Sequence, residues 1–375
     1  MVVTYGDVPL LTADTIADLV REHTDNQHAI TIVTARLADP TGYGRIVRDD
    51  SGAVREIREH RDADAAILAI DEINSGVLAV DATFLARVLE TLEPSNSQGE
   101  YYLTDIVGAA VAQDLPVGAH LLEDVWQTEG VNDRRQLARL GAELNRRIGD
   151  KWMLAGVTIV DPASTWIDTA VELASDVTIL PGTHLLGATV VAAGATIGPD
   201  TTLRNVEVGA GATVVRTHGS DALIGAGASV GPFAYLRPGT ELGTDAKVGT
   251  FVETKNTKVG DGAKIPHLSY LGDATVGAGA NVGAGAITAN YDGQHKHPTA
   301  IGRQAKIGCD NVFVAPVTIG DGAYTGAGSI VRDDIPAGAL AVSAGEQRNM
   351  EGWVAAKRPG TPADDAAKET TGADD

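Results

Sequence analysis

The chain has 375 residues, and this length favours two domains over a single core. Its formal net charge of −21 argues against nucleic acid as a partner, because binding of phosphate backbones needs clustered Lys and Arg. The single cysteine excludes an intramolecular disulfide framework and a Cys-rich zinc site. The N-terminal residues lack the pattern of a signal peptide, and no apolar run is long enough to span a membrane. We therefore expect a cytoplasmic protein without a membrane partner.

The first 131 residues have the pattern of an α/β domain. A helix is expected after Thr12, whose side chain can cap its N-terminus. Residues 29–34 form an apolar run typical of a buried strand. Residues 46–47 and 54–57 flank a turn sequence, as in a β-hairpin.

A charged helix is expected next, at residues 132–150, with an apolar side that suits a connector. We assign residues 132–155 to this linker and residues 156–345 to a second domain. The last residues, 346–375, are rich in Pro, Ala, Asp and Gly and have little to bury. They are expected to form a largely disordered tail.

The second domain has a repeat of six residues. The residues that keep this spacing are, in three runs, Ile167, Leu173, Ile179, Leu185, Val191, Ile197 and Leu203; Ile224, Val230, Leu236, Leu242, Val248 and Thr254; and Ile301, Ile307, Phe313, Ile319, Thr325 and Val331. A period of six fits neither a helix nor a two-faced strand. It predicts a parallel β-helix in which each hexad forms one face and three hexads close a coil. Residues 290–298 interrupt the repeat, and such a loop is where function usually lies.

One segment of this domain carries candidate chemistry. His267 can act as a general base, because an imidazole titrates near neutral pH and can take the proton that an amine must lose before it attacks a thioester. Arg237, Lys255 and Lys296 could hold a sugar phosphate. The plain alternative is a surface imidazole and three solvated charges. A zinc site from four other histidines is a further alternative, although their irregular spacing does not favour it: His184, His218, His295 and His297.

Long stretches of the chain resemble a known enzyme family. In the second half they are LRPGTELG, KVGTFVETKNTKVG, HLSYLGDATVGAGANVGAGAITANYDG and FVAPVTIGDGAYTGAGS; in the first half they are YGDVPLL, DPTGYGRI, REHRDA, EINSGV, QGEYYLTD and EGVNDRRQL. They closely resemble the bifunctional N-acetylglucosamine-1-phosphate uridyltransferase/glucosamine-1-phosphate N-acetyltransferase, over nearly the whole chain. The resemblance implies an incomplete, Rossmann-like nucleotidyltransferase domain followed by a left-handed parallel β-helix of hexapeptide repeats.

The resemblance implies acetyl transfer from acetyl-CoA to the amine of glucosamine-1-phosphate, which serves UDP-N-acetylglucosamine and cell-wall synthesis. His267 matches the family's catalytic base. The positions that match amino-sugar-phosphate contacts are Arg237, Lys255, Tyr270, Asn281 and Lys296, and those that match acetyl-CoA contacts are Ala284, Asn290, Tyr291, Cys309 and Ala327. Many relatives have Ser where this chain has Cys309. Members of the family are similar in being homotrimers with the acetyl site between neighbouring solenoids, so a monomer is expected to be inactive.

In the front half, Asp7 and Asn132 match the positions that hold Mg²⁺. The matches to UDP-sugar contacts are Tyr5, Gly6, Gly44, Glu59 and Asn74. The sequence departs from the family in lacking the Gly-rich loop with its basic residue, the first strand and helix and the uracil-reading segment. Phosphoryl transfer depends on positioning and charge neutralisation, so we expect the uridyltransferase activity to be lost.

Two other functions remain open on the sequence. The chain could be a non-catalytic subunit, since nucleotidyltransferase-like domains joined to hexapeptide solenoids also serve in regulation or assembly. It could also be an acyltransferase for another amine or hydroxyl, which the fold alone allows. The constellation of His267, Tyr270, Asn290 and Tyr291 argues against the first alternative, and the three cations argue for a phosphorylated acceptor.

Overall fold

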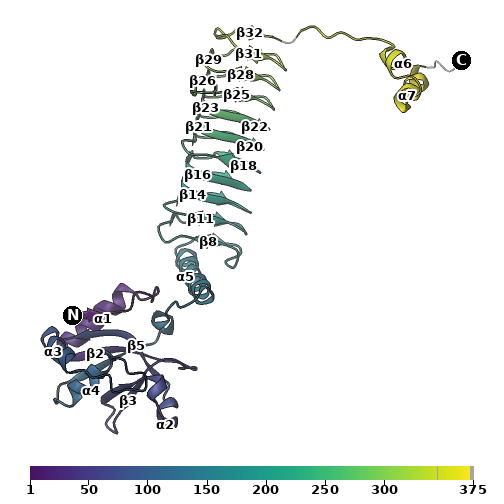
Figure 1. Cartoon of the computed structure of the whole chain (residues 1–375). Coiled ribbons are helices and arrows are strands. Elements are labelled where there is room, and N and C mark those ends of the chain that lie inside the picture. The colour runs from purple at the N-terminus through teal and green to yellow at the C-terminus, as the bar shows by residue number, and fades with distance from the viewer. Residues whose placement is uncertain (344, 372–375) are drawn as a thin grey trace. The chain divides into compact units, whose positions relative to one another are not determined.

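The computed structural model describes residues 1–343 and 345–371. The chain divides into two compact units, Met1–Arg147 and Ile148–Asp375, each described by itself (Figure 1). The linker expected at residues 132–155 corresponds to helix α5 (Arg134–Leu154), on which the division between the units falls. Within the described residues, no helix is long and apolar enough to cross a membrane.

The first unit is a six-stranded sheet with helices on both faces. Its strands are β1 (Val2–Val3), β2 (Ile30–Arg36), β3 (Arg45–Arg48), β4 (Val54–Arg58), β5 (Glu72–Val80) and β6 (Val117–Leu122), and its helices besides α5 are α1 (Ala13–Asp25), α2 (Ala65–Leu68), α3 (Ala82–Val88) and α4 (Asp105–Val111), with 3-10 turns at His60–Asp62, Leu89–Thr91 and Val125–Thr128. The strand order is β4-β3-β5-β2-β6, with β1 paired to β5. The expected hairpin is present as the antiparallel pair β3 and β4.

Local sequence and packing explain these elements. The Thr12 hydroxyl accepts the Thr15 N–H, so the expected N-cap of α1 is confirmed. Strand β2 is buried along most of its length because both faces of the sheet are covered. Leu19 of α1 packs on one face with Val33, whereas Phe84 of α3 packs on the other with Ile32.

The second unit is a parallel β-solenoid with three faces (Figure 1). Each coil contributes one short strand to each face. Face A is the eleven-stranded sheet of β7 (Thr158–Ile159), β10 (Thr178–Ile179), β13 (Thr196–Ile197), β15 (Thr213–Val214), β17 (Ser229–Val230), β20 (Lys247–Thr250), β22 (Lys264–His267), β24 (Asn281–Val282), β27 (Lys306–Ile307), β30 (Tyr324–Thr325) and β32 (Leu340–Ala341). Face B holds β8 (Trp166–Ile167), β11 (His184–Leu186), β18 (Ala234–Leu236), β25 (Ile287–Ala289), β28 (Val312–Val314) and β31 (Ile330–Val331). Face C holds β9 (Glu172–Leu173), β12 (Val190–Val191), β19 (Glu241–Leu242), β26 (Thr299–Ile301) and β29 (Val317–Ile319). Four longer strands turn the corner from face B to face C: β14 (Thr202–Val208), β16 (Thr217–Ile224), β21 (Glu253–Val259) and β23 (Tyr270–Val276).

The predicted parallel β-helix is confirmed. All the residues that keep the six-residue spacing are buried, and the aliphatic ones join a single core. The spacing breaks because some corners use one residue fewer, so that Val259 follows Thr254 by five positions. At that B/C corner, Asn256 takes a left-handed conformation with φ of 46°, which Asn tolerates better than most residues.

The C-terminal residues contain two helices, α6 (Trp353–Lys357) and α7 (Pro362–Thr371), where the sequence analysis expects disorder. Two local features favour α7. The Thr361 carbonyl oxygen accepts backbone N–H groups of its first turn, and Lys368 pairs with Asp364 one turn earlier at 3.1 Å. Residues 344 and 372–375 of the expected tail region lie outside the described residues.

Candidate functional site

Three of the expected phosphate-binding cations meet at the edge of face B that borders the B/C corner. Arg237 and Lys255 lie on successive coils, because the Arg237 backbone N–H donates to the Thr254 carbonyl oxygen at 2.9 Å. Interaction with the Lys296 side chain, followed by burial, lowers the pKa of Lys255. Asp273 lies 3.9 Å from the Lys255 ammonium and opposes this shift. Cations held this close together favour an anionic ligand beside them.

The loop at residues 290–298 carries Lys296 to this place and is bonded internally. The carboxylate of Asp292 accepts the His295 backbone N–H at 2.7 Å and contacts His297 Nε2 at 2.7 Å. These contacts, the His295 N–H first, hold the pKa of Asp292 far below its ordinary value. The loop is therefore a defined support for Lys296.

Tyr270 and Asn290 lie beside the cations. The Asn290 amide is buried and donates to Asp273 Oδ2 at 2.6 Å, and Asn256 donates to Asp273 Oδ1 at 2.8 Å. A Cβ atom placed on Gly272 would lie 2.3 Å from the Tyr270 hydroxyl and 2.7 Å from the Asn290 amide nitrogen. The absence of a side chain at Gly272 thus leaves room for both polar groups over this part of face B.

The expected base and three of the acetyl-CoA residues form a column at the corner between faces A and B. His267, Ala284, Cys309 and Ala327 lie on successive coils: the N–H following Ala284 donates to the His267 carbonyl oxygen at 3.4 Å, and the N–H following Ala327 donates to that of Cys309 at 2.8 Å. His267 and Cys309 are exposed. Ser269 Oγ donates to the His267 carbonyl oxygen at 2.7 Å and fixes its backbone.

Three of the expected site residues lie apart from the other residues that were expected to bind the same ligand. Asn290 and Tyr291, expected with acetyl-CoA, lie at the B/C corner, across face B from the Cys309 column. Asn281, expected with the sugar phosphate, lies on face A in register with Lys264 and Lys306. One chain therefore does not bring all the expected contacts to one surface.

The histidines of the zinc alternative are dispersed. His184 and His218 belong to strands on face B, and the His218 ring packs edge-on against Tyr235 at 5.5 Å. His295 and His297 lie in the loop, where Asp292 binds both. Across residues 1–343 and 345–371, no group of three His, Cys, Asp or Glu side chains is arranged to hold a metal ion.

Three acidic or amide residues of this site were missed by the sequence analysis. Glu253 pairs with Arg237 at 2.8 Å. Asp273 accepts a hydrogen bond from the Asn290 amide and lies near the Lys255 ammonium, and Asn256 donates to Asp273. Asp273 and Asn256 both occupy left-handed corner positions, at φ of 50° and 46°. An Asn or Asp just outside the hexad spacing was the signal that could have identified them.

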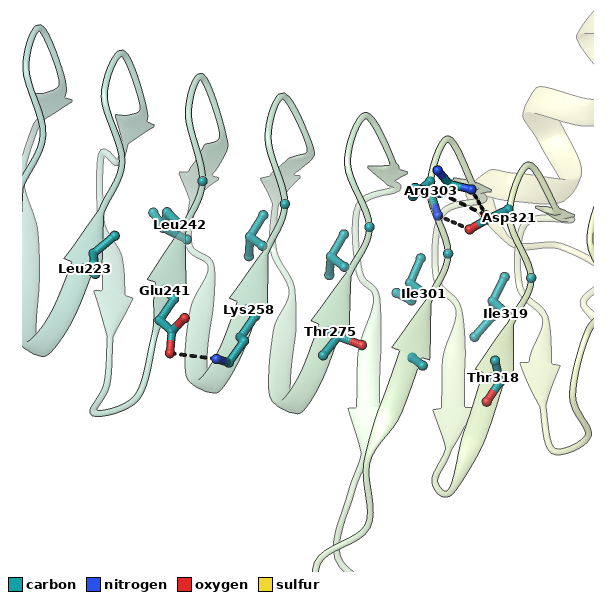
Figure 2. Close-up of a pocket in the computed structure, with 18 residues that line it drawn as sticks. Leu223, Glu241, Leu242, Lys258, Thr275, Ile301, Arg303, Thr318, Ile319 and Asp321 are labelled. Atoms are coloured by element: carbon teal, nitrogen blue, oxygen red, sulfur yellow. Dashed lines mark hydrogen bonds and ion pairs between the residues drawn. The ribbon is translucent and has the colours of Figure 1, made fainter.

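A groove of about 570 Å³ on the solenoid contains none of the expected site residues (Figure 2). It follows face C and the C/A corner, where glycines such as Gly277 and Gly302 leave the backbone open. Ion pairs between coils cross it, Glu241 with Lys258 at 3.0 Å and Arg303 with Asp321 at 2.7 Å. The charges of these two pairs are matched within the chain.

The first unit has a cleft of about 340 Å³ that gathers most of the expected nucleotide and metal residues. Those lining it are Tyr5, Asp7, Gly44, Glu59, Asn74 and Asn132; Gly6 is not among the lining residues. The Val131 N–H donates to the Asp7 carbonyl oxygen at 2.9 Å, which holds Asn132 beside Asp7. Gln136 Oε1 accepts the Asn132 N–H at 2.6 Å. The carboxylate and amide oxygens of Asp7 and Asn132 are ligands of the kind Mg²⁺ prefers, so this donor pair fits the ion.

Two tyrosines of this cleft have raised pKa values. The Tyr5 ring lies against Gly76, where a Cβ atom would come within 1.8 Å of it. Burial, then the charges of Glu59 and Asp7, raise the pKa of Tyr5. Burial likewise raises the pKa of Tyr43, which the sequence analysis did not identify.

Known proteins that are similar in sequence to this chain show which family it belongs to. A family model described as "Nucleotidyl transferase" matches residues 1–168. The chain is 57% identical to "Bifunctional protein GlmU" of Kineococcus radiotolerans over 98% of this chain and 75% of that protein. It is 58% identical to the protein of the same name from Paenarthrobacter aurescens over 96% of this chain and 73% of that one. The chain belongs to the GlmU family.

The similarity to the GlmU proteins covers both units of the chain, so both units belong to this enzyme family. It spans about three quarters of the length of these GlmU proteins. The nucleotidyl transferase match starts at residue 1, and it lends no support to the expectation that this domain lacks its first strand and helix. A solved Arabidopsis UDP-N-acetylglucosamine acyltransferase is similar over 54% of this chain and 81% of its own, at 15% identity and a TM-score of 0.32. The GlmU proteins, rather than this distant structure, decide the family.

Proposed function

We propose that the solenoid transfers acetyl from acetyl-CoA to the amine of glucosamine-1-phosphate. The observation that carries the proposal is the convergence of Arg237, Lys255 and Lys296, from two coils and the loop, at one edge of face B. A phosphate is the group best matched to such a set of cations. The family relationship supports a bifunctional enzyme, and the cations favour a phosphorylated acceptor over a neutral one.

His267 is the proposed general base, at the opposite edge of face B from the cations. The amine of the sugar gives a proton to the His267 imidazole as its nitrogen attacks the thioester carbonyl carbon. The tetrahedral intermediate then collapses, the C–S bond breaks, and the CoA sulfur leaves as thiolate and takes up a proton. Tyr270 and Asn290, beside the cations, are proposed to orient the sugar and the acyl carbonyl.

Acetyl-CoA is the proposed cosubstrate along the column of Ala284, Cys309 and Ala327. Small side chains at Ala284 and Ala327 leave the corner open for an extended arm. We also propose a homotrimer in the cytoplasm, in which a site lies between neighbouring solenoids. The separation of Asn290 and Tyr291 from the Cys309 column supports such a shared site, since one chain does not bring them together.

For the first unit we propose that these 375 residues do not carry out uridylyl transfer. The support is the absence from their sequence of a Gly-rich loop with a basic residue, the element that cradles a triphosphate. Asp7 and Asn132 would hold Mg²⁺, which neutralises phosphate charge when bound. Pyrophosphate release at an ordinary rate from UTP, N-acetylglucosamine-1-phosphate and Mg²⁺ would refute this part of the proposal.

The test of acetyl transfer is release of free CoA thiol on mixing the chain with acetyl-CoA and glucosamine-1-phosphate. We expect release that His267→Ala lowers by about 10²–10⁴-fold, the usual contribution of a general base. His184→Ala, an exposed histidine several coils away on face B, is the matched control and should leave the rate unchanged. No release from a folded, oligomeric chain would overturn the proposal.

A further inference from the structure

A second cavity of the first unit, of about 530 Å³, takes no part in the sites described above. It lies at the amino ends of the parallel strands β2 and β6, between the end of α1 and the start of α3, and its polar lining includes His23, His28, Asp81 and Arg87. The front cleft contains Asn74, at the opposite end of β5 from Asp81. The two positions are roughly 20 Å apart along an extended strand. The cavity is therefore separate from the nucleotide cleft.

Two histidines of this cavity share one buried hydroxyl. Oγ1 of Thr31, a fully buried residue, lies 3.1 Å from Nδ1 of His23 and 3.0 Å from Nδ1 of His28. The backbone N–H of His28 also donates to the His23 carbonyl oxygen at 3.1 Å. The His28 ring has room because Gly118 carries no side chain: a Cβ atom there would lie 2.2 Å from His28 Nδ1. The pair of rings is thus held in a defined position.

The shared hydroxyl determines where the two rings carry their protons. Burial, then the N-terminal ammonium group and His28, lower the pKa of His23, which keeps its ring neutral near pH 7, although Asp81 opposes the shift. In the part of the chain that the structure describes, Thr31 Oγ1 has no other hydrogen-bond partner. One hydroxyl proton can serve only one ring, so Thr31 donates to one Nδ1 and accepts Nδ1–H from the other. At Nε2, one neutral ring is therefore a donor and the other an acceptor.

The charged groups of the cavity also include both kinds of partner. Arg87 of α3 is exposed, and it makes none of the ion pairs found among the described residues. Asp81 uses Oδ1 to accept the Phe84 N–H at 2.7 Å, which caps α3. Its second carboxylate oxygen can accept a further proton donor. The cavity therefore suits an anion that can itself donate a hydrogen bond.

Gln27 is a second sign of a ligand at this place. It follows Asn26, the C-cap of α1, and has φ of 52°. Glycine is the usual residue at this left-handed position, because a side chain there strains the backbone. The Gln27 side chain lines the cavity, and its amide group can donate to an anion. Strain at a position whose side chain faces a cavity is typical of a binding site.

We propose that this cavity binds a small phosphate anion that still carries a proton, either hydrogen phosphate or the monoanion of a phosphate monoester. Arg87, Gln27 and the Nε2–H of one histidine donate to its oxygens, and Asp81 or the Nε2 lone pair of the other histidine accepts its O–H. Sulfate and carboxylates have no such proton near pH 7. The cavity is larger than a phosphate group and has Phe84 and Leu115 in its wall, so it can also hold an organic part. The proposal does not depend on acetyl transfer.

Titration calorimetry with inorganic phosphate tests the proposal, at pH 7 and constant ionic strength without divalent cations. The chain used carries Lys255→Ala and Lys296→Ala, so that the solenoid cations do not contribute. Phosphate should bind about 10-fold or more tightly than sulfate, because sulfate leaves an acceptor of the cavity unsatisfied. Arg87→Ala should weaken phosphate binding by about 10-fold or more. Arg55→Ala, which removes an arginine of the same unit that is paired with Asp49, is the matched control and should change nothing.

The variant Gln27→Gly separates binding from folding. Glycine relieves the left-handed backbone at this position, so the thermal midpoint of the first unit should stay equal or rise. Phosphate affinity should nevertheless fall by about 2–10-fold, because the amide donor is lost. Unchanged affinity would exclude Gln27 from the site and remove one of the two supports of the proposal.

A further measurement uses the unaltered chain. Diethyl pyrocarbonate modifies imidazole nitrogens, and phosphate should slow modification of His23 and His28, read by mass spectrometry, while sulfate should not. His184, exposed on the solenoid, is the internal control and should react equally in all cases. Tighter binding of phenyl phosphate than of phosphate would assign the cavity to a monoester, and the reverse would assign it to hydrogen phosphate. Absence of phosphate binding, equal binding of sulfate, or equal losses from Arg87→Ala and Arg55→Ala would overturn the proposal.

Discussion

The two units bring functional residues together by different means. In the first unit, the cleft takes Asp7, Glu59, Asn74 and Asn132 from separate segments joined only by the tertiary fold. In the solenoid, His267 and Cys309 belong to one column in which each residue lies a coil from the next. The cleft therefore depends on the whole α/β sheet, whereas the acetyl corner depends on the register of a few neighbouring coils.

A core substitution in the sheet tests most strongly whether the two units are stable independently of each other. Ile32 is fully buried, so Ile32→Ala should cost about 2–5 kcal/mol and expose the first unit to protease. The solenoid should survive as a fragment that begins within α5, because its coils contact mainly their neighbours. Limited proteolysis with N-terminal sequencing measures this, and Ile197→Ala in the solenoid core is the matched change. Loss of the solenoid as fast as the sheet would contradict the separation of the two units.

A glycine of the C/A corner tests the register within the solenoid. A Cβ atom on Gly277 would lie 2.4 Å from the Arg303 backbone nitrogen, so Gly277→Ala must push two coils apart. We expect a loss of about 1–3 kcal/mol, seen as faster hydrogen exchange in β24 and β27 and lower acetyl transfer. Gly262→Ala is the control: its φ is 64° but nothing lies within 4 Å of the added atom, so only backbone strain is expected. Equal effects of the two would show that coil contact is unimportant.

Glu143 on α5 should make the stability of the first unit sensitive to acid. Hydrogen bonds from Arg146, and then Arg147, lower the pKa of Glu143 to about 2 from an ordinary 4.5. A depressed folded-state pKa gives stability that is fully present above pH 4.5 and is lost as the pH falls toward about 2. Glu143→Gln should flatten the decline of first-unit stability with acid over that range, measured by denaturation at several pH values. An unchanged slope would mean that the pair contributes nothing.

Residue spacing alone predicted the solenoid, whereas the residues of the cleft were expected only from the family resemblance, and the reasons are physical. The six-residue spacing identified buried positions such as Leu203 and Phe313, because inward and outward alternation is a local property. The spacing could not show on which face a residue lies, because the corners between the faces differ in length. Only the strand registers place Asn281 on face A and Lys255 on face B. In the first unit, Gln136 supports Asn132 through the N-terminus of a helix, but no spacing linked that segment to Asp7.

The smallest effect is expected at the exposed ion pair of Glu241 and Lys258. The side chains are 50% and 68% exposed, and pairs this exposed contribute about 0–1 kcal/mol. Glu241→Ala should therefore change the thermal midpoint of the solenoid by only a degree or two, and less still in high salt. Because Leu242 beside it is buried in the common core, Leu242→Ala should cost several times more. A larger loss from Glu241→Ala than from Leu242→Ala would mean that surface charge, rather than the inward column, holds the coils together.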